Sequence, residues 1–269
     1  MIKLLKIEWL KMKNYTAFVA IGLIFLVCVL GVNFIAYSLN KTVQETPVGG
    51  LMESYFSFPN VWHTVSWLSN FTLFLPGVLI ILMITNEFTY KTHRQNIIDG
   101  WSRDEFIKVK IVIVFIFSAI ATIWVFLVAL MIGLISGGTF SFDKIHFVGS
   151  FFIQSVSILM LALMVSVIVK RAGLAIAIFI AYVYILENLV GVIINGLQIK
   201  NATDPTKYTP FADLLPINAT DNLVPFPFFR VMLNRAVPHL NIYLLLGASI
   251  VYLVGYILIS RKQFLTKDL

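Results

Sequence analysis

A carboxylate inside an apolar segment is the first residue in this sequence whose type could do chemistry. Glu187 lies in the stretch YVYILENLVGVIIN, and at helical spacing it shares one stripe of polar and small residues with Tyr184, Asn188, Gly191 and Asn195. A charge near the middle of a bilayer costs roughly 3 kcal/mol unless it is neutralised or paired. We expect either a residue of a substrate pathway or proton relay, or a protonated or hydrogen-bonded glutamate that joins two helices.

A second group of reactive side chains forms the polar stretch NEFTYKTHRQNIIDGWSRDEF at residues 86–106. Ser102 and Glu105 have the spacing of a capping box, which predicts a helix that begins at Ser102 and continues into the next apolar segment. Upstream, Asn86 has the side chain of an N-cap, and Gly100 is a natural stop for a short helix. The pattern predicts a short helix across the membrane plane, a turn and a sharply capped membrane helix.

Motifs for catalysis or metal binding are missing from the sequence. There is no G-x-x-x-x-G-K-[ST] phosphate loop and no H-E-x-x-H pair. The four histidines are too scattered to suggest a cluster, and the single Cys28 excludes a disulfide within one chain. The sequence predicts a chain that is not an enzyme and that binds no cofactor of its own.

Six apolar segments must position these residues. The chain is 59% hydrophobic and only 12% charged, against about 25% charged in soluble proteins. Each segment is long enough to cross a bilayer, which takes roughly 20 residues as a helix. We expect an all-α membrane protein with one domain, residues 1–269, and six transmembrane helices at about 17–39, 67–85, 111–136, 147–169, 173–195 and 241–260.

The distribution of charge predicts the orientation. The net charge is +7, and most Lys and Arg residues fall on one side of the predicted spans. The positive-inside rule places that side, with both termini, in the cytoplasm. The basic character therefore needs no nucleic-acid partner.

Three further segments have recognisable patterns. The opening MIKLLKIEWLKMKN is typical of an amphipathic helix in the membrane interface, or of a positive flank that only sets orientation. Pro76 and Gly77 predict a kink in the second span. Residues 196–240 hold six of the nine prolines and many aromatics, so we expect short helices that re-enter the outer leaflet.

The stretch from Glu87 to Lys110 resembles the cytoplasmic loop of the permease subunits of type-2 ABC transporters. Glu87 matches the glutamate that opens the family's coupling helix, Thr92 its threonine, and Lys110 its lysine at the membrane edge. The other matches are the hydrophobic run at Ile97 and Ile98 and the Ser-Arg pair at Ser102 and Arg103. Lys91 departs from the pattern because the family usually has glycine there.

The resemblance implies a permease subunit of an ATP-driven exporter in the bacterial cytoplasmic (inner) membrane. Its partners would be a cytoplasmic ATPase dimer, which binds the ATP and Mg, and a second permease subunit. Apolar residues would enter a groove on the ATPase, namely Phe88, Ile97, Ile98 and Trp101. Charged residues would fix the register, namely Glu87, Arg94, Asp99 and Arg103.

Two other functions stay open at the level of the sequence. One is an ion-coupled secondary carrier centred on Glu187, and the other is a membrane anchor or sensor that transports nothing. The lack of intramembrane charge pairs in the sequence disfavours the carrier. The cargo of an exporter would be amphipathic or lipophilic, such as a peptide antibiotic, a lipid or a drug.

Overall fold

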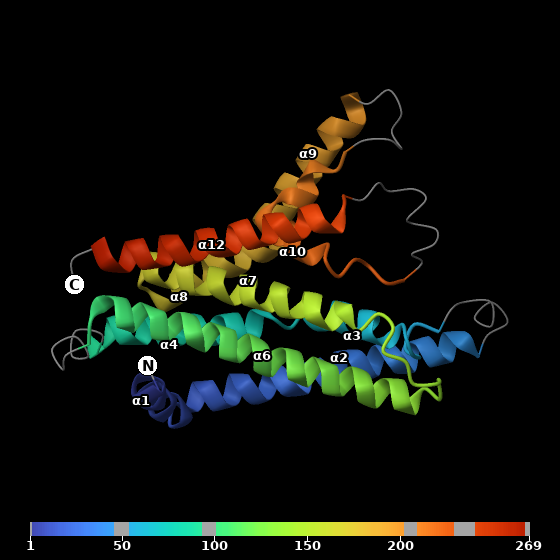
Figure 1. Ribbon diagram of the computed structural model, residues 1–269, viewed down its shortest axis with the longest axis horizontal. Helices are drawn as coiled ribbons and strands as arrows, with labels where there is room; N and C mark the ends of the chain where they lie inside the picture. Colours follow the sequence, from blue (N-terminus) through green and yellow to red (C-terminus); the bar gives the residue numbers. More distant parts are fainter. Residues whose placement is uncertain (1, 46–53, 93–100, 202–208, 229–239, 267–269) are drawn as a thin grey trace.

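The computed structural model describes residues 2–45, 54–92, 101–201, 209–228 and 240–266. Within these residues the protein is helical and contains no strand, as the sequence predicts. The long helices lie side by side in one bundle, and α9 diverges from it (Figure 1).

The helices follow the predicted apolar segments closely. Their bounds are α1 (Ile2–Lys13), α2 (Thr16–Gln44), α3 (Val61–Asn70), α4 (Phe74–Thr89), α6 (Arg103–Ile135), α7 (His146–Val169), α8 (Ala172–Ala181), the π-helical turn η2 (Tyr182–Leu186), α9 (Glu187–Asn201), the 3-10 turn η3 (Phe211–Leu214), α10 (Pro216–Asp221) and α12 (Ile242–Thr266). Five spans of the described chain are long and apolar enough to cross a membrane, and the bent pair α3 and α4 makes up to six.

The second predicted span differs from the expectation in three ways. It is two helices, α3 and α4, bent by 43°, and the break falls at residues 71–73 rather than at Pro76 and Gly77. Pro76 instead lies in the first turn of α4, where its missing N–H interrupts no helical hydrogen bond. Asn86 caps no new helix, because α4 continues through it to Thr89.

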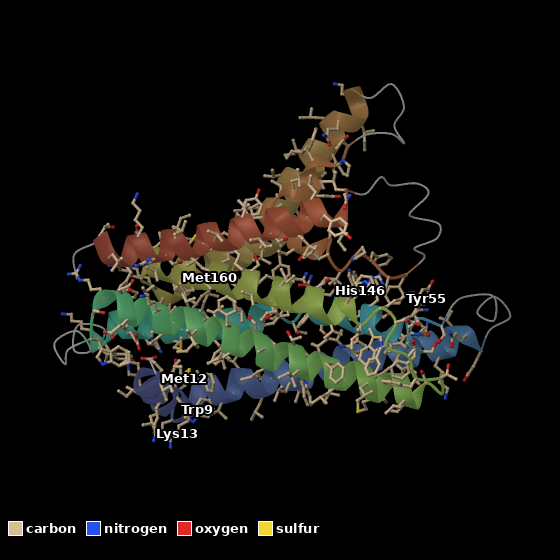
Figure 2. All side chains as sticks on the ribbon, viewed as in Figure 1. Trp9, Met12, Lys13, Tyr55, His146 and Met160 are labelled. Atoms are coloured by element: carbon tan, nitrogen blue, oxygen red, sulfur yellow. The ribbon has the colours of Figure 1, made fainter. Side chains whose placement is uncertain are left out.

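Helix α7 forms the centre of the bundle. It is the most buried of the candidate spans, and it contacts α4, α6 and α12. Met160 in its middle is fully enclosed (Figure 2). By contrast, α2 and α12 keep many large apolar side chains exposed, as helices that face lipid do.

Helix α1 has a buried face and an exposed face, but Trp9 does not share the buried face with Met12, although the helical spacing of Leu5, Trp9 and Met12 predicts that it does. Met12 is buried in the core, whereas Trp9 is 53% exposed and Lys13 points away from the bundle (Figure 2). The helix lies at the same end of the bundle as the C-terminal part of α12 (Figure 1). Its place in a membrane interface stays a prediction.

Two short helices follow α9 in the proline-rich segment. η3 and α10 pack against α9 and α12, and α10 also contacts α7. Ile217, Ala219 and Thr220 of α10 are buried. The predicted short helices therefore exist in the described part of this segment, and their depth in a membrane stays a prediction.

Candidate functional site

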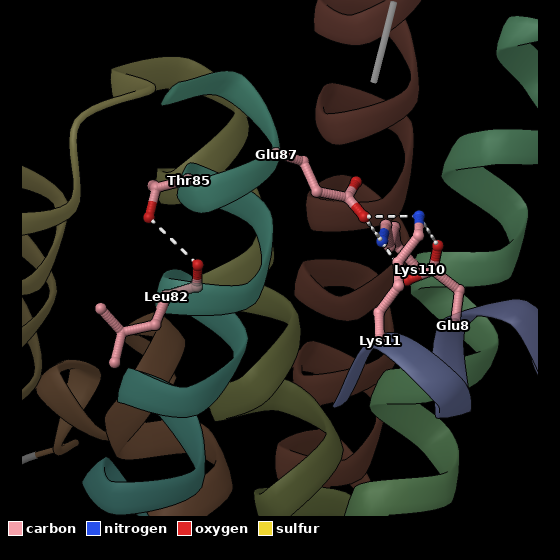
Figure 3. A network of polar contacts seen from close by, with 6 residues as sticks. All are labelled: Glu8, Lys11, Leu82, Thr85, Glu87 and Lys110. Carbon is pink, nitrogen blue, oxygen red and sulfur yellow. Dashed lines mark hydrogen bonds and ion pairs between the residues drawn. The ribbon is translucent and has the colours of Figure 1, made fainter. Parts of the chain in front are cut away.

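Four charged side chains meet at the end of the bundle nearest α1, and we call them the charge cluster: Glu8, Lys11, Glu87 and Lys110 (Figure 3). The ammonium group of Lys110 lies 2.5 Å from Oε2 of Glu8 and 2.8 Å from Oε1 of Glu87. Lys11 completes the cluster, with its Nζ 2.9 Å from Oε1 of Glu8 and 3.2 Å from Oε1 of Glu87. Two acids and two bases therefore alternate in space.

Three of the four side chains of the cluster are removed from solvent. The side chains of Glu8 and Lys110 are each 1% exposed and that of Glu87 is 8% exposed, while Lys11 keeps 36%. Buried charges are strongly unfavourable unless they are paired and hydrogen-bonded. Burial by itself raises the pKa of Glu8, but the charges of Lys110 and Lys11 outweigh it and hold this pKa below its usual value.

The cluster joins three helices that are remote in sequence. Glu8 and Lys11 come from one face of α1, Glu87 from the last turn of α4, and Lys110 from the second turn of α6. The residues between α4 and α6 are the middle part of the polar stretch 86–106. The cluster therefore ties α1 to both ends of that connection.

The C-terminal end of the connection is held by the predicted capping box. The Ser102 hydroxyl accepts from the Glu105 N–H at 3.1 Å, and the Glu105 carboxylate accepts from the Ser102 N–H at 3.0 Å. This prediction is confirmed. Arg103 then donates to the carbonyl of Leu265 at 3.3 Å, and Arg261 pairs with Asp104 at 2.8 Å. The start of α6 is thereby fastened to the end of α12.

The described docking candidates lie around the cluster. Phe88 is half-buried, 6.3 Å from the Phe264 ring and 5.1 Å from Nζ of Lys170. Trp101 is half-buried with Nζ of Lys11 5.8 Å from its ring centre, and Thr92 is exposed. Glu87 points inward to the charge cluster. Arg94, Ile97 and Ile98 lie outside the described residues, so docking stays a prediction.

At Lys91 the sequence departs from the family pattern, and the backbone there has an unusual conformation. Its φ is +57°, in the left-handed region, directly after Tyr90 closes α4. Glycine adopts this conformation without strain and lysine does not. The position that usually holds glycine in the resembling family thus has a backbone that favours glycine here.

Glu187 forms a separate site with the proline-rich segment. Its Oε1 accepts from the backbone N–H groups of Ile217 at 2.6 Å and Asn218 at 2.7 Å. These are the first turn of α10, where N–H groups have no helical partner and negative charge is favoured. The geometry accords with a glutamate that joins two elements, and a pathway role stays a prediction.

Of the predicted stripe, Gly191 faces Asn218 of α10, whereas Tyr184 and Asn188 donate hydrogen bonds to backbone carbonyls. Tyr184 donates to the carbonyl of Phe71 at 3.3 Å, and Asn188 donates to the carbonyl of Tyr184 at 3.1 Å. The π-helical turn η2 lies directly before Glu187. Its wider winding changes the register along the helix, which an even helical spacing does not anticipate.

The sequence patterns did not lead us to predict several residues of these sites. Glu8 had a signal, because it is the only acid among residues 1–44 and stands three residues before Lys11. No sequence pattern pointed to Asp221, although its carboxylate accepts hydrogen bonds from Gln154 at 2.6 Å and from Asn70 at 3.4 Å. With Glu187 at its other end, α10 is held at both termini.

Comparison with known proteins places the larger part of the chain in one family. The family model described as "ABC-2 family transporter protein" matches residues 4–188, which is more than half of the chain. The match includes all of the charge cluster and Glu187, and it ends before α10 and α12. No curated protein matches the chain.

Proposed function

Because the chain belongs to the ABC-2 transporter family and is a permease component of an ABC transporter, we propose that the connection between α4 and α6 couples it to a separate ATPase. The chain would form the membrane pathway of an exporter, and ATP with Mg would bind to the partner. The region that carries this proposal is the charge cluster, since it joins α1 to both flanks of the connection.

The mechanism follows from this attachment. A force on residues 90–102 acts on the end of α4 and the start of α6, which Glu87 and Lys110 hold together at 2.8 Å. The same ammonium group holds Glu8, so α1 moves with them. Closure of an ATPase dimer would therefore tilt α4 and α6 as one body, in the manner of rigid-body switching.

The remaining parts of the transporter are also proposals. A second permease, identical or related, would complete the pathway. The large exposed apolar side chains of α9, such as Val192 at 71% and Ile193 at 60%, support contact with lipid or with that partner. The chain would lie in the bacterial inner membrane with both termini in the cytoplasm. The aromatic residues of the segment 196–240 and the few intramembrane charges favour an amphipathic or lipophilic cargo.

Docking is tested by changing Ile98 to Asp, since a charge in a desolvated apolar anchor typically costs at least about 2 kcal/mol. The tagged chain is purified in detergent from its native membrane, and the co-purifying phosphate-loop ATPase is measured by mass spectrometry and by ATP hydrolysis. We expect recovery of the ATPase to fall about tenfold or more. Phe88 is less suitable because its contact with Phe264 adds a stability effect.

The matched control is Phe142→Asp, at an exposed aromatic (59%) beyond the far end of α6. It should leave recovery of the ATPase unchanged. Equal recovery with Ile98→Asp and wild type would refute the docking model. If the chain instead purified alone and transported cargo on a proton gradient, with loss of transport in Glu187→Gln, the carrier hypothesis would replace it.

A further inference from the structure

Two adjoining cavities lie beside α1, α2 and α4, and the second also reaches α6. The first shares Glu8, Lys11 and Glu87 with the charge cluster, but the coupling proposal assigns no ligand to either cavity. The first has a volume of about 200 Å³, and its lining includes Lys11, Tyr15, Asn86 and Tyr90 beside the carboxylates of the charge cluster. The second has about 190 Å³ and an apolar lining that includes Trp9, Gly22, Phe25 and Phe117. Phe18 and Leu79 line both cavities.

The polar cavity lies near the start of α2, and the apolar cavity lies farther along the same helix. The polar cavity reaches α2 at Tyr15 and Phe18, at the start of the helix. The apolar cavity continues along α2 from Phe18 to Leu26, which is about 12 Å of helix. One leaflet of the hydrocarbon core is about 15 Å thick. The pair of cavities therefore matches the polar and apolar parts of one leaflet.

The polar cavity carries charges of both signs and suits a zwitterionic head group, with its phosphodiester at Lys11 and its cationic group near the carboxylates of Glu8 and Glu87. Its carboxylates are buried and engaged by Lys110 and Lys11, whereas Lys11 itself remains 36% exposed. The other polar groups of the lining, on Tyr15, Asn86 and Tyr90, include hydrogen-bond donors. A phosphodiester is an acceptor that such donors and an ammonium group bind well.

We propose that these two cavities bind one membrane phospholipid, with its phosphodiester at Lys11 and Tyr15 and an acyl chain in the apolar cavity. The two volumes, about 200 and 190 Å³, accommodate part of the head group and part of one acyl chain, and the rest of the lipid would lie in the bilayer. Water is a poor occupant of the apolar cavity because water needs several polar partners. Lipid is the apolar molecule that surrounds these helices. The site shares Lys11 with the charge cluster, but binding of a resident lipid there requires no ATPase.

Gly22 allows the apolar cavity to be filled selectively. A Cβ atom placed there meets nothing within 4 Å, so Gly22→Leu would project into the cavity without a backbone clash. Gly31 lies on the same helix, has equally open space, and lines neither cavity. Gly31→Leu is therefore the matched control, and Gly22→Val is a smaller second variant if Gly22→Leu folds poorly.

The test uses the full chain in phosphatidylethanolamine–phosphatidylglycerol vesicles. They contain a small fraction of phosphatidylcholine with a photoreactive diazirine in mid-chain. After irradiation, peptide mass spectrometry locates the labelled residues. We expect labels on residues 18–26 and 117–121, reduced at least threefold by Gly22→Leu and unchanged by Gly31→Leu. A diazirine alkane without a head group should label these residues at least threefold less.

Three results would overturn the proposal. The first is equal labelling of these segments in the Gly22→Leu and Gly31→Leu chains. The second is equal labelling by the alkane and the phospholipid, which would remove the role of the phosphodiester. The third is cross-linking of these residues to a second copy of the chain, which would make the cavities part of an interface between permeases. None of these results bears on ATPase recovery.

Discussion

Replacement of Lys110 by Met tests whether the charge cluster is structurally required. The side chain of Lys110 is 1% exposed, and it contacts both Glu8 and Glu87. Methionine keeps much of the apolar stem, so the change removes chiefly the charge. Two carboxylates would then share Lys11, which is itself partly exposed.

The magnitude follows from the burial of the remaining charges. Loss of one partner from a buried ion pair costs about 3–5 kcal/mol. Lys11 still contacts both carboxylates, so we expect the lower end, about 3 kcal/mol. By the scaling of soluble proteins, in which 1 kcal/mol is worth about 2–4 °C, the thermal midpoint should fall by roughly 6–12 °C.

The assay is thermal unfolding of the detergent-solubilised chain, followed by intrinsic fluorescence. Lys108→Met is the matched control, because Lys108 lies on the same helix, is 49% exposed, and pairs only at the surface with Asp104. Such surface pairs contribute about 0–1 kcal/mol. A double-mutant cycle with Glu8→Gln should give a coupling energy of about 1 kcal/mol or more, as expected of groups in contact. Equal midpoints for Lys110→Met and Lys108→Met would refute the reasoning.

Three further predictions follow from the same geometry. Lys91→Gly should raise the free energy of unfolding by about 1 kcal/mol, because glycine tolerates the left-handed φ of +57°; Lys91→Val should lower it, and the opposite order in a denaturation series would contradict the backbone argument. Glu187→Ala should leave the N–H groups of Ile217 and Asn218 without their acceptor, at a cost of about 1–3 kcal/mol. Hydrogen exchange at these two amides should accelerate in Glu187→Ala, whereas Glu187→Gln should retain most of the protection. Unchanged exchange in Glu187→Ala would show that Glu187 does not protect the first turn of α10. The pKa of Glu8 is lowered below 4.5 in the folded chain, so its stabilising contribution is present above about pH 4.5 and is lost as the pH falls through the folded pKa. Glu8→Gln should therefore flatten the acid side of a stability–pH profile, and an unaltered profile would show that Glu8 is not stabilised as an anion.

Local patterns explain why much of this protein is predictable from its sequence. The spans follow from apolar length, because a lipid-facing backbone must satisfy its own hydrogen bonds and does so as a helix. The capping box at Ser102 and Glu105 is equally local, because its partners are three residues apart. The class of membrane protein, the approximate spans and the start of α6 were accordingly determined by the sequence alone.

Contacts between distant residues were decided only by the tertiary structure. Glu8 and Lys110 are separated by 102 positions, and no spacing rule predicts that three helices bring them together. Glu187 likewise binds α10, 30 positions away. The break between α3 and α4 falls before Pro76, where a proline costs no hydrogen bond. Burial and packing select these partners, because a charge that leaves water is stable only where the fold supplies its counterpart.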